Sequence, residues 1–101
     1  MIIYQGNTYK LPVKLKRDGL PVTTDNVKTV EFCFGNITKK YPEDVTFTDD
    51  TFMVALTQED TFALQGVVMC QMRVLFTDGT VECTDKEPMS IYDSISKVVL
   101  K

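Results

Sequence analysis

The sequence predicts an all-β domain, an antiparallel sandwich or barrel of seven to eight short strands with one short helical turn. Hydrophobic residues recur with a period of two along most of the chain, and helical periodicity over longer windows is largely missing. Turn signals return at intervals of about ten residues, a spacing typical of sandwiches and barrels. With 101 residues, 44% of them hydrophobic and 25% charged, residues 1–101 are expected to form a single domain.

The clearest alternation begins at Tyr9, where apolar residues at odd positions up to Leu15 alternate with lysines and a proline. Because Pro12 has no N–H to donate to a neighbouring strand, we expect this strand to lie at the edge of a sheet. Arg17-Asp18-Gly19 then has the composition of a turn. The segment from Lys28 to Phe34 repeats the alternation and predicts the next strand, which Gly35-Asn36 ends.

The middle of the chain predicts a hairpin and a short helix. Residues Thr46 to Leu56 alternate on either side of Asp49-Asp50, which we interpret as the tight turn of the hairpin. Thr57 and Asp60 have the spacing of a capping box, so a helix is expected to begin there and to end before Gly66 within about two turns.

The segment from Val67 to Phe76 is apolar on both faces except at Gln71 and Arg73, which predicts a central strand buried on both sides. Asp78-Gly79 is the strongest hairpin signal and joins this strand to one over Val81–Thr84. A last strand is expected over Met89–Tyr92. The terminal residues Ser94–Lys101 are expected either to continue it or to form a short helix.

Composition excludes several classes of function. The formal net charge is −3, which argues against a general binder of nucleic acid or of anionic membranes. Without any histidine, catalytic triads, proton shuttles and zinc sites that depend on histidine are impossible. No apolar run reaches the length of a membrane helix, and the first residues lack the features of an export signal.

The remaining reactive groups predict no cofactor, no metal and no catalysis. Cys33, Cys70 and Cys83 are expected to be reduced and partly buried, with a Cys33–Cys70 bridge or a metal site as alternatives. The acids occur as neighbouring pairs in expected turns or at the helix start, where they are common for local reasons. Calcium binding is the alternative for four of them: Glu43, Asp44, Asp49 and Asp50.

Three groups of residues are candidates for contact with another protein. The first is the stripe Lys10, Lys14 and Lys16, which also suits an edge strand that must avoid aggregation. The second comprises Met69, Gln71 and Arg73, on the face of the central strand that a small sandwich is expected to leave uncovered. The third lies in the apolar terminal segment: Val98, Val99 and Leu100.

Two stretches of the chain support a family resemblance. Leu56–Thr61, followed by an apolar strand with Gln71–Val74 and by the Asp78-Gly79 turn, resembles small phage and prophage structural proteins of Gram-positive bacteria. It is similar to the immunoglobulin-like N-terminal domain of phage baseplate upper proteins. The segment Gln5–Tyr9 looks like the opening strand of the same family.

This resemblance implies an immunoglobulin-like antiparallel β-sandwich and a virion part of the tail, baseplate or neck. Such a protein acts by binding itself and other virion proteins, and is found in the bacterial cytoplasm during assembly and then in the virion. Baseplate upper proteins continue beyond this domain, whereas this sequence stops at Lys101, so a free-standing relative and a fragment both stay open. A carbohydrate-binding module on the same scaffold is the alternative function, and an enzyme ranks third.

Overall fold

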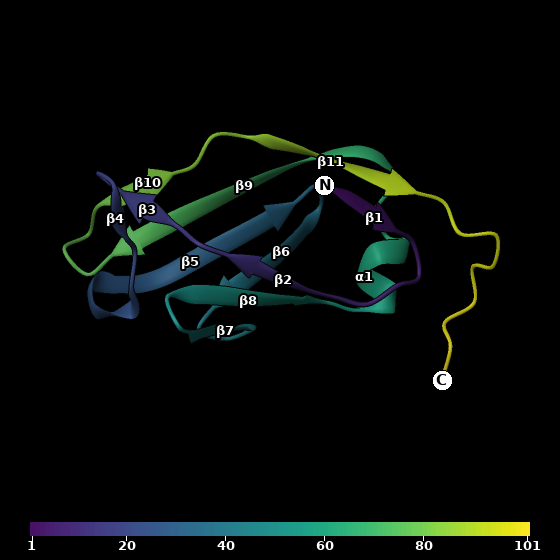
Figure 1. Ribbon diagram of the computed structural model, residues 1–101, viewed down its shortest axis with the longest axis horizontal. Helices are drawn as coiled ribbons and strands as arrows, with labels where there is room; N and C mark the ends of the chain where they lie inside the picture. Colours follow the sequence, from purple (N-terminus) through teal and green to yellow (C-terminus); the bar gives the residue numbers. More distant parts are fainter.

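The computed structural model describes all residues from Met1 to Lys101, with eleven strands and two short helical segments (Figure 1). Strands account for 54% of the residues and helical segments for 8%. The molecule is elongated and measures 46 × 26 × 20 Å along its principal axes. Neither helical segment has the length and hydropathy that crossing a lipid bilayer requires.

The larger sheet has six strands in the order β1-β11-β9-β5-β6, with β10 pairing the end of β9 that β11 does not reach. All its pairs are antiparallel except β1 with β11, which run parallel. Its strands are β1 (Ile2–Tyr4), β5 (Val27–Phe34), β6 (Ile37–Tyr41), β9 (Gly66–Phe76), β10 (Val81–Cys83) and β11 (Glu87–Tyr92).

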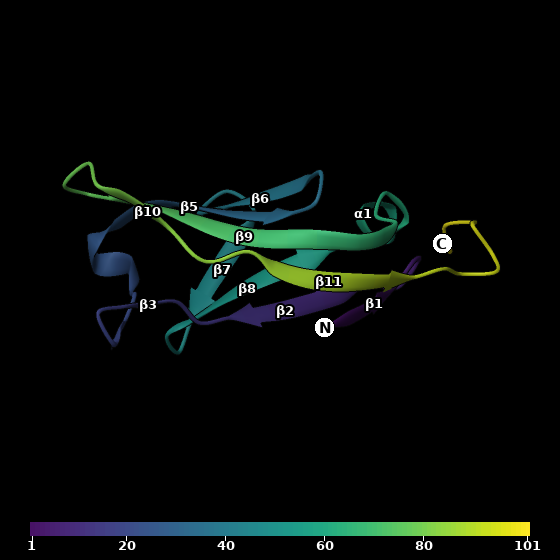
Figure 2. The same cartoon turned by 90° about the horizontal axis from the view of Figure 1, so that it is seen from above.

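The smaller sheet has three strands in the order β2-β8-β7, all antiparallel. Seen edge-on in Figure 2, these strands form one layer, and β5, β6 and β9 form the other. The strands are β2 (Tyr9–Val13), β7 (Val45–Thr48) and β8 (Thr51–Leu56), and a separate hairpin consists of β3 (Lys16–Arg17) and β4 (Leu20–Pro21). The helical segments are the 3-10 turn η1 (Thr24–Asn26) and α1 (Gln58–Phe62).

The chain crosses repeatedly between the two layers. Strand β2 lies in the smaller sheet, β5 and β6 in the larger, β7 and β8 in the smaller, and β9 to β11 in the larger. Two sheets that are antiparallel apart from the β1–β11 pair and are connected in this way form an immunoglobulin-like sandwich. The predicted fold class is therefore confirmed. The parallel pairing of β1 beside the last strand is an addition that the sequence did not indicate.

The core lies between the sheets because each strand turns alternate apolar residues inward. Phe32 and Phe52 are fully buried, one from each sheet, with ring centroids 5.6 Å apart. Phe47 and Tyr41 pack against Phe52 from the sheet edges, at 4.7 and 5.4 Å. This aromatic cluster holds the two layers together, since large rings contribute most of the buried apolar area.

The local signals read from the sequence are confirmed. Asp49 and Asp50 both have positive φ, of 53° and 59°, as a two-residue turn that matches the strand twist requires. Thr57 accepts a hydrogen bond from the Asp60 N–H at 3.1 Å, and the Asp60 carboxylate accepts one from the Thr57 N–H at 2.8 Å. Asp78-Gly79 joins β9 to β10, and Pro12 lies in an edge strand.

Three expectations need correction. Eleven strands are present, because the strand expected from Tyr9 to Lys16 breaks after Val13 and because β1 and the β3–β4 hairpin were not anticipated. Strand β9 is central but has only one buried face, since nothing covers the outer side of the larger sheet. Both predictions for the terminal segment from Ser94 are wrong, because the segment is neither strand nor helix. Its backbone is held by side chains described below.

Candidate protein-contact surfaces

The outer face of the larger sheet exposes apolar side chains. On β9, Val67 and Met69 point away from the core because Val68 and Cys70 point into it. The strand register places Val67 opposite Ser90 of β11, which in turn lies opposite Ile2 of β1. These residues therefore form a row across three neighbouring strands.

The exposed residues of these rows form one patch, which we call the apolar face patch. Tyr4 and Tyr92 lie opposite each other and pack edge to face, with ring centroids 5.4 Å apart. The members are Ile2, Tyr4, Val67, Met69, Pro88 and Tyr92. Apart from Pro88, which is also exposed, their exposed fractions run from 47% to 66%. Contiguous exposed apolar surface is typical of sites that bind another molecule, so this patch is a candidate contact surface.

The patch has a polar border on β9. Gln71 donates a hydrogen bond to the carbonyl of Thr84 at 3.0 Å, and Arg73 forms an ion pair with Glu31 at 3.7 Å. Both side chains lie on the same outer face as Met69, as expected from their spacing. Of the three predicted residues on this strand, Met69 thus belongs to the patch, whereas Gln71 and Arg73 border it.

The predicted lysine stripe is divided between two elements. Lys10 lies on β2, Lys14 follows that strand, and Lys16 lies on β3; all three are exposed. Lys10 and Pro12 face outward on the edge of the smaller sheet, where nothing pairs with β2 on its free side. Lysines in this position discourage another strand from pairing with the edge.

The terminal segment runs past α1 at the end of the molecule opposite the β3–β4 hairpin (Figure 1). Both polar atoms of the Gln58 side-chain amide bind the backbone of this segment at Leu100. Nε2 donates to the Leu100 carbonyl and Oε1 accepts from the Leu100 N–H, both at 2.8 Å. Val99 is half-buried against the domain. Val98 and Leu100 are 69% and 78% exposed, so their side chains are free to meet a partner.

A cluster of hydrogen bonds, which we call the polar cluster, joins residues near both ends of the chain to Thr61 of α1 and to Leu64. Gln5, which is buried, donates to the Leu64 carbonyl at 2.7 Å and accepts from Lys97 at 2.6 Å. Thr61 is fully buried, and its hydroxyl accepts from the Gly6 N–H and lies 2.9 Å from the Asn7 carbonyl. The two stretches that carry the family resemblance are therefore in direct contact.

Glycine is required at position 6 of the polar cluster for two reasons. Its φ is +83°, a conformation that residues with a side chain rarely adopt. A Cβ at this position would also lie 2.8 Å from the Phe62 ring.

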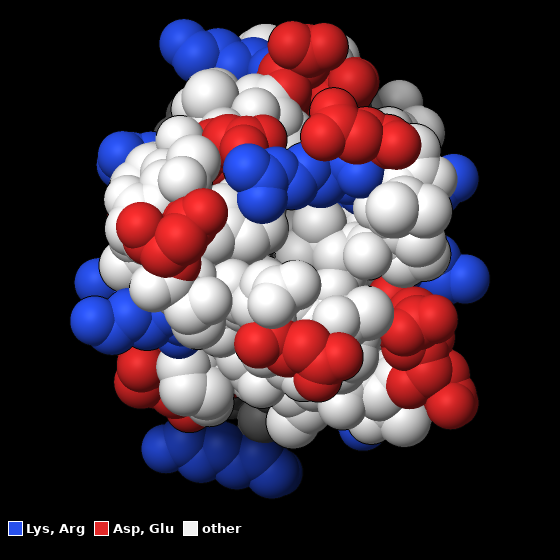
Figure 3. Space-filling model, turned by 90° about the vertical axis from the view of Figure 1, so that its left-hand side faces the viewer, with Lys and Arg blue, Asp and Glu red and all other residues white.

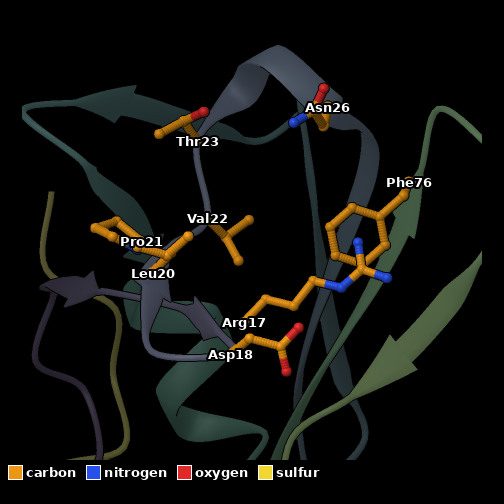
Figure 4. Close-up of a pocket in the computed structure, with 8 residues that line it drawn as sticks. All are labelled: Arg17, Asp18, Leu20, Pro21, Val22, Thr23, Asn26 and Phe76. Carbon is orange, nitrogen blue, oxygen red and sulfur yellow. The ribbon is translucent and has the colours of Figure 1, made fainter.

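At the opposite end, a small cavity of about 250 Å³ lies between the β3–β4 hairpin, η1 and the end of β9. Arg17 is part of its lining, and the guanidinium lies 4.2 Å from the Phe76 ring centroid (Figure 4). The same guanidinium forms an ion pair with Glu82 at 2.7 Å. Acidic and basic side chains are interspersed around this end, with an uncharged hollow between them (Figure 3). The ring is buried beneath Arg17, so this cavity offers no aromatic platform for a sugar.

Of the three cysteines expected to be partly buried, Cys70 is buried and Cys33 is partly buried, whereas Cys83 is exposed. All three cysteines are free, and Cys33 and Cys70 cannot be bridged because they point to opposite faces of the larger sheet. Burial raises the pKa of both thiols, so both are protonated at neutral pH. No group of three or more cysteine, aspartate or glutamate side chains is arranged to hold a metal ion.

No protein-family model matches this chain, and no curated protein matches its sequence. The functional argument therefore rests on the surfaces described above. Sequence reasoning missed Ile2, Tyr4 and Tyr92, which join the patch only because β1 pairs with β11. The one signal that could have revealed Ile2 and Tyr4 is the short run Ile2-Ile3-Tyr4, whose residue types favour a strand. Nothing in the sequence indicated that Gln5 and Gln58 hold the terminal segment.

Proposed function

We propose that this chain is a non-catalytic structural component of a phage or prophage particle, in the tail, baseplate or neck. It assembles with copies of itself and with other virion proteins, first in the bacterial cytoplasm and then in the virion. The observation that carries this proposal is the apolar face patch, since a domain of this size gains nothing in its own fold from exposing six such residues side by side.

Two further observations support the proposal. The stretches Gln5–Tyr9 and Leu56–Thr61, which carry part of the resemblance to baseplate upper proteins, are joined by hydrogen bonds between the Thr61 hydroxyl and the backbone of Gly6 and Asn7. Virion parts also reach stability through symmetric repetition, in which one surface is used many times.

Solution mass tests the proposal. The chain is measured by light scattering across a dilution series with reductant present, so that oxidised thiols cannot join the copies. We expect a closed oligomer that dissociates on dilution. A monomer at every concentration would contradict the proposal that copies of the chain assemble with one another.

A carbohydrate-binding module is the second candidate, favoured by the neighbouring half-exposed rings of Tyr4 and Tyr92. Sugars stack on exposed aromatic faces, and here the two rings are nearly perpendicular, at 89°. A glycan array distinguishes the two candidates. Binding that Tyr4→Ala and Tyr92→Ala remove would favour the carbohydrate module, whereas an array without binding beside a concentration-dependent mass favours assembly.

A further inference from the structure

Sulfur-bearing side chains gather in a groove between β2 and the segment from Thr84 to Met89, where the two sheets leave a volume of about 390 Å³. The chain has three cysteines and five methionines, and four of these residues line the groove: Met1, Cys70, Met72 and Met89. The lining comprises only 14 of the 101 residues. Half of the sulfur atoms of the chain are therefore concentrated at one place.

The strand register brings three of these residues together. Cys70 and Met72 are two positions apart on β9 and both face the core, so their Cα atoms lie about 7 Å apart. Met89 lies on the neighbouring strand β11, opposite Val68, which places it diagonally from Cys70 on the same face. The Cys70 thiol donates a hydrogen bond to the Met89 sulfur, with the two sulfur atoms 4.0 Å apart.

The distance between these two sulfur atoms fits a shared metal ion. Two sulfur ligands that each lie about 2.3 Å from a metal, at an angle of about 120°, are about 4 Å apart. Cys70 and Met89 already have this spacing. Met72 is only partly buried and has three rotatable bonds, so its thioether can turn to complete a trigonal site.

The donor set favours one kind of metal. Thiolate and thioether sulfur are soft ligands that suit Cu(I), whereas magnesium and calcium require oxygen. A Cu(I) ion with one thiolate is neutral, while a divalent ion would leave a positive charge among apolar residues such as Leu11 and Phe34. The charged residues of the lining, Lys14, Asp85 and Glu87, are all exposed, so water solvates their charges.

We propose that Cys70, Met72 and Met89 form a binding site for one Cu(I) ion, with the Cys70 thiolate and the two thioethers as ligands. On binding, the S–H bond of Cys70 breaks, its proton passes to water and a Cu–S bond forms. Copper stays in the Cu(I) state, so no oxidant or reductant is consumed. The site goes beyond the proposed function, because it lies on the core side of β9 and not on the apolar face patch.

Competition for copper tests the site. The chain with Cys33→Ser and Cys83→Ser, which removes the other two thiols, is titrated without oxygen against Cu(I) held by the chelator bicinchoninate, with ascorbate present. Loss of the absorbance of the chelator complex measures the copper that the chain takes up. We expect one Cu(I) ion per chain. No transfer of copper at any chelator concentration overturns the inference.

Variants in the same background identify the ligands. Met72→Leu and Met89→Leu remove the sulfur but keep an apolar side chain of similar volume, so the fold is retained. Each should weaken Cu(I) binding about tenfold or more, and Cys70→Ala about a hundredfold or more, because a soft ligand is lost. Met53→Leu on the smaller sheet is the matched control and should not change binding. Equal affinity in the Met89→Leu and Met53→Leu variants overturns the inference.

Discussion

The two outer faces of the sandwich differ in what their alternate positions expose. On the smaller sheet, the outward positions of β7 are Thr46 and Thr48, and β2 contributes Lys10. On the larger sheet, the outward positions at the start of β9 are Val67 and Met69. Both faces belong to antiparallel sheets over the same core, so packing within the chain does not require the difference. The apolar side is therefore the one that we propose for contact with another molecule.

Placing charges on each face tests this comparison with the largest expected effect. Val67→Arg with Met69→Arg should weaken assembly by about a hundredfold or more, because two charges would have to be buried in the contact. Light scattering across a dilution series measures the change. The matched control is Thr46→Arg with Thr48→Arg, which has the same spacing on the other face. Equal effects of the two pairs would contradict the assignment.

The next prediction separates folding from assembly. Thr61→Val should lower the free energy of unfolding by about 1–3 kcal/mol, because the Gly6 N–H and the Asn7 carbonyl lose their hydrogen bonds to the hydroxyl of the fully buried Thr61. Chemical denaturation measures this loss. The control Thr77→Val, at an exposed position without a side-chain hydrogen bond, should change stability by less than about 0.5 kcal/mol. A similar loss in both variants would show that the polar cluster contributes little to the free energy of unfolding.

Asp60 predicts a dependence of stability on pH. Burial alone would raise the pKa of this carboxyl, but hydrogen bonds from Lys39, at 2.9 Å, and from the Thr57 N–H hold it below its usual 3.8. Because the pKa is lowered in the folded state, the stabilisation is complete above the unfolded pKa and is lost as pH falls through the folded pKa.

Asp60→Asn should therefore cost about 1 kcal/mol at neutral pH, and its difference from the wild type should shrink as the solution is acidified below pH 3.8. Denaturation curves at several pH values measure this. Glu59→Gln is the control, since Glu59 is exposed in the same helical turn and makes no ion pair. A constant difference at all pH values would contradict the role of the ionised carboxylate.

The smallest effect is expected from two lysines of the predicted stripe, Lys10 on β2 and Lys16 on β3. Lys10→Ala with Lys16→Ala should change the dissociation constant of assembly by less than about threefold, because exposed charges contribute little in salt. Measurements at two ionic strengths check this. A tenfold loss of assembly at low salt would move the contact to the smaller sheet and reverse the comparison.

The parts of the fold that the sequence predicts are those determined by neighbouring residues. The capping box of Thr57 and Asp60, the Asp49-Asp50 turn and the alternation of β5 are local, and each is present in the structure. The parallel partner of β1 and the hold of Gln58 on Leu100 join residues far apart in the chain. No local pattern encodes such pairs.

The candidate contact residues show the same division. Met69 could be predicted because Val67–Phe76 is apolar on both faces, and a small sandwich covers only one of them. Tyr4 and Tyr92 could not, since their proximity depends on the order of strands in the sheet.

Methionine oxidation compares the two faces most directly, because each carries one methionine. Met69 is in the apolar face patch, and Met53 of β8 lies between Pro12 and Thr46 on the smaller sheet. Samples at several chain concentrations are treated with the same dilute peroxide, and the sulfoxide at each methionine is measured by peptide mass. We predict that oxidation of Met69 slows as the chain concentration rises, while oxidation of Met53 does not change. A rate at Met69 that is independent of concentration, or slowing at Met53 alone, would contradict the account.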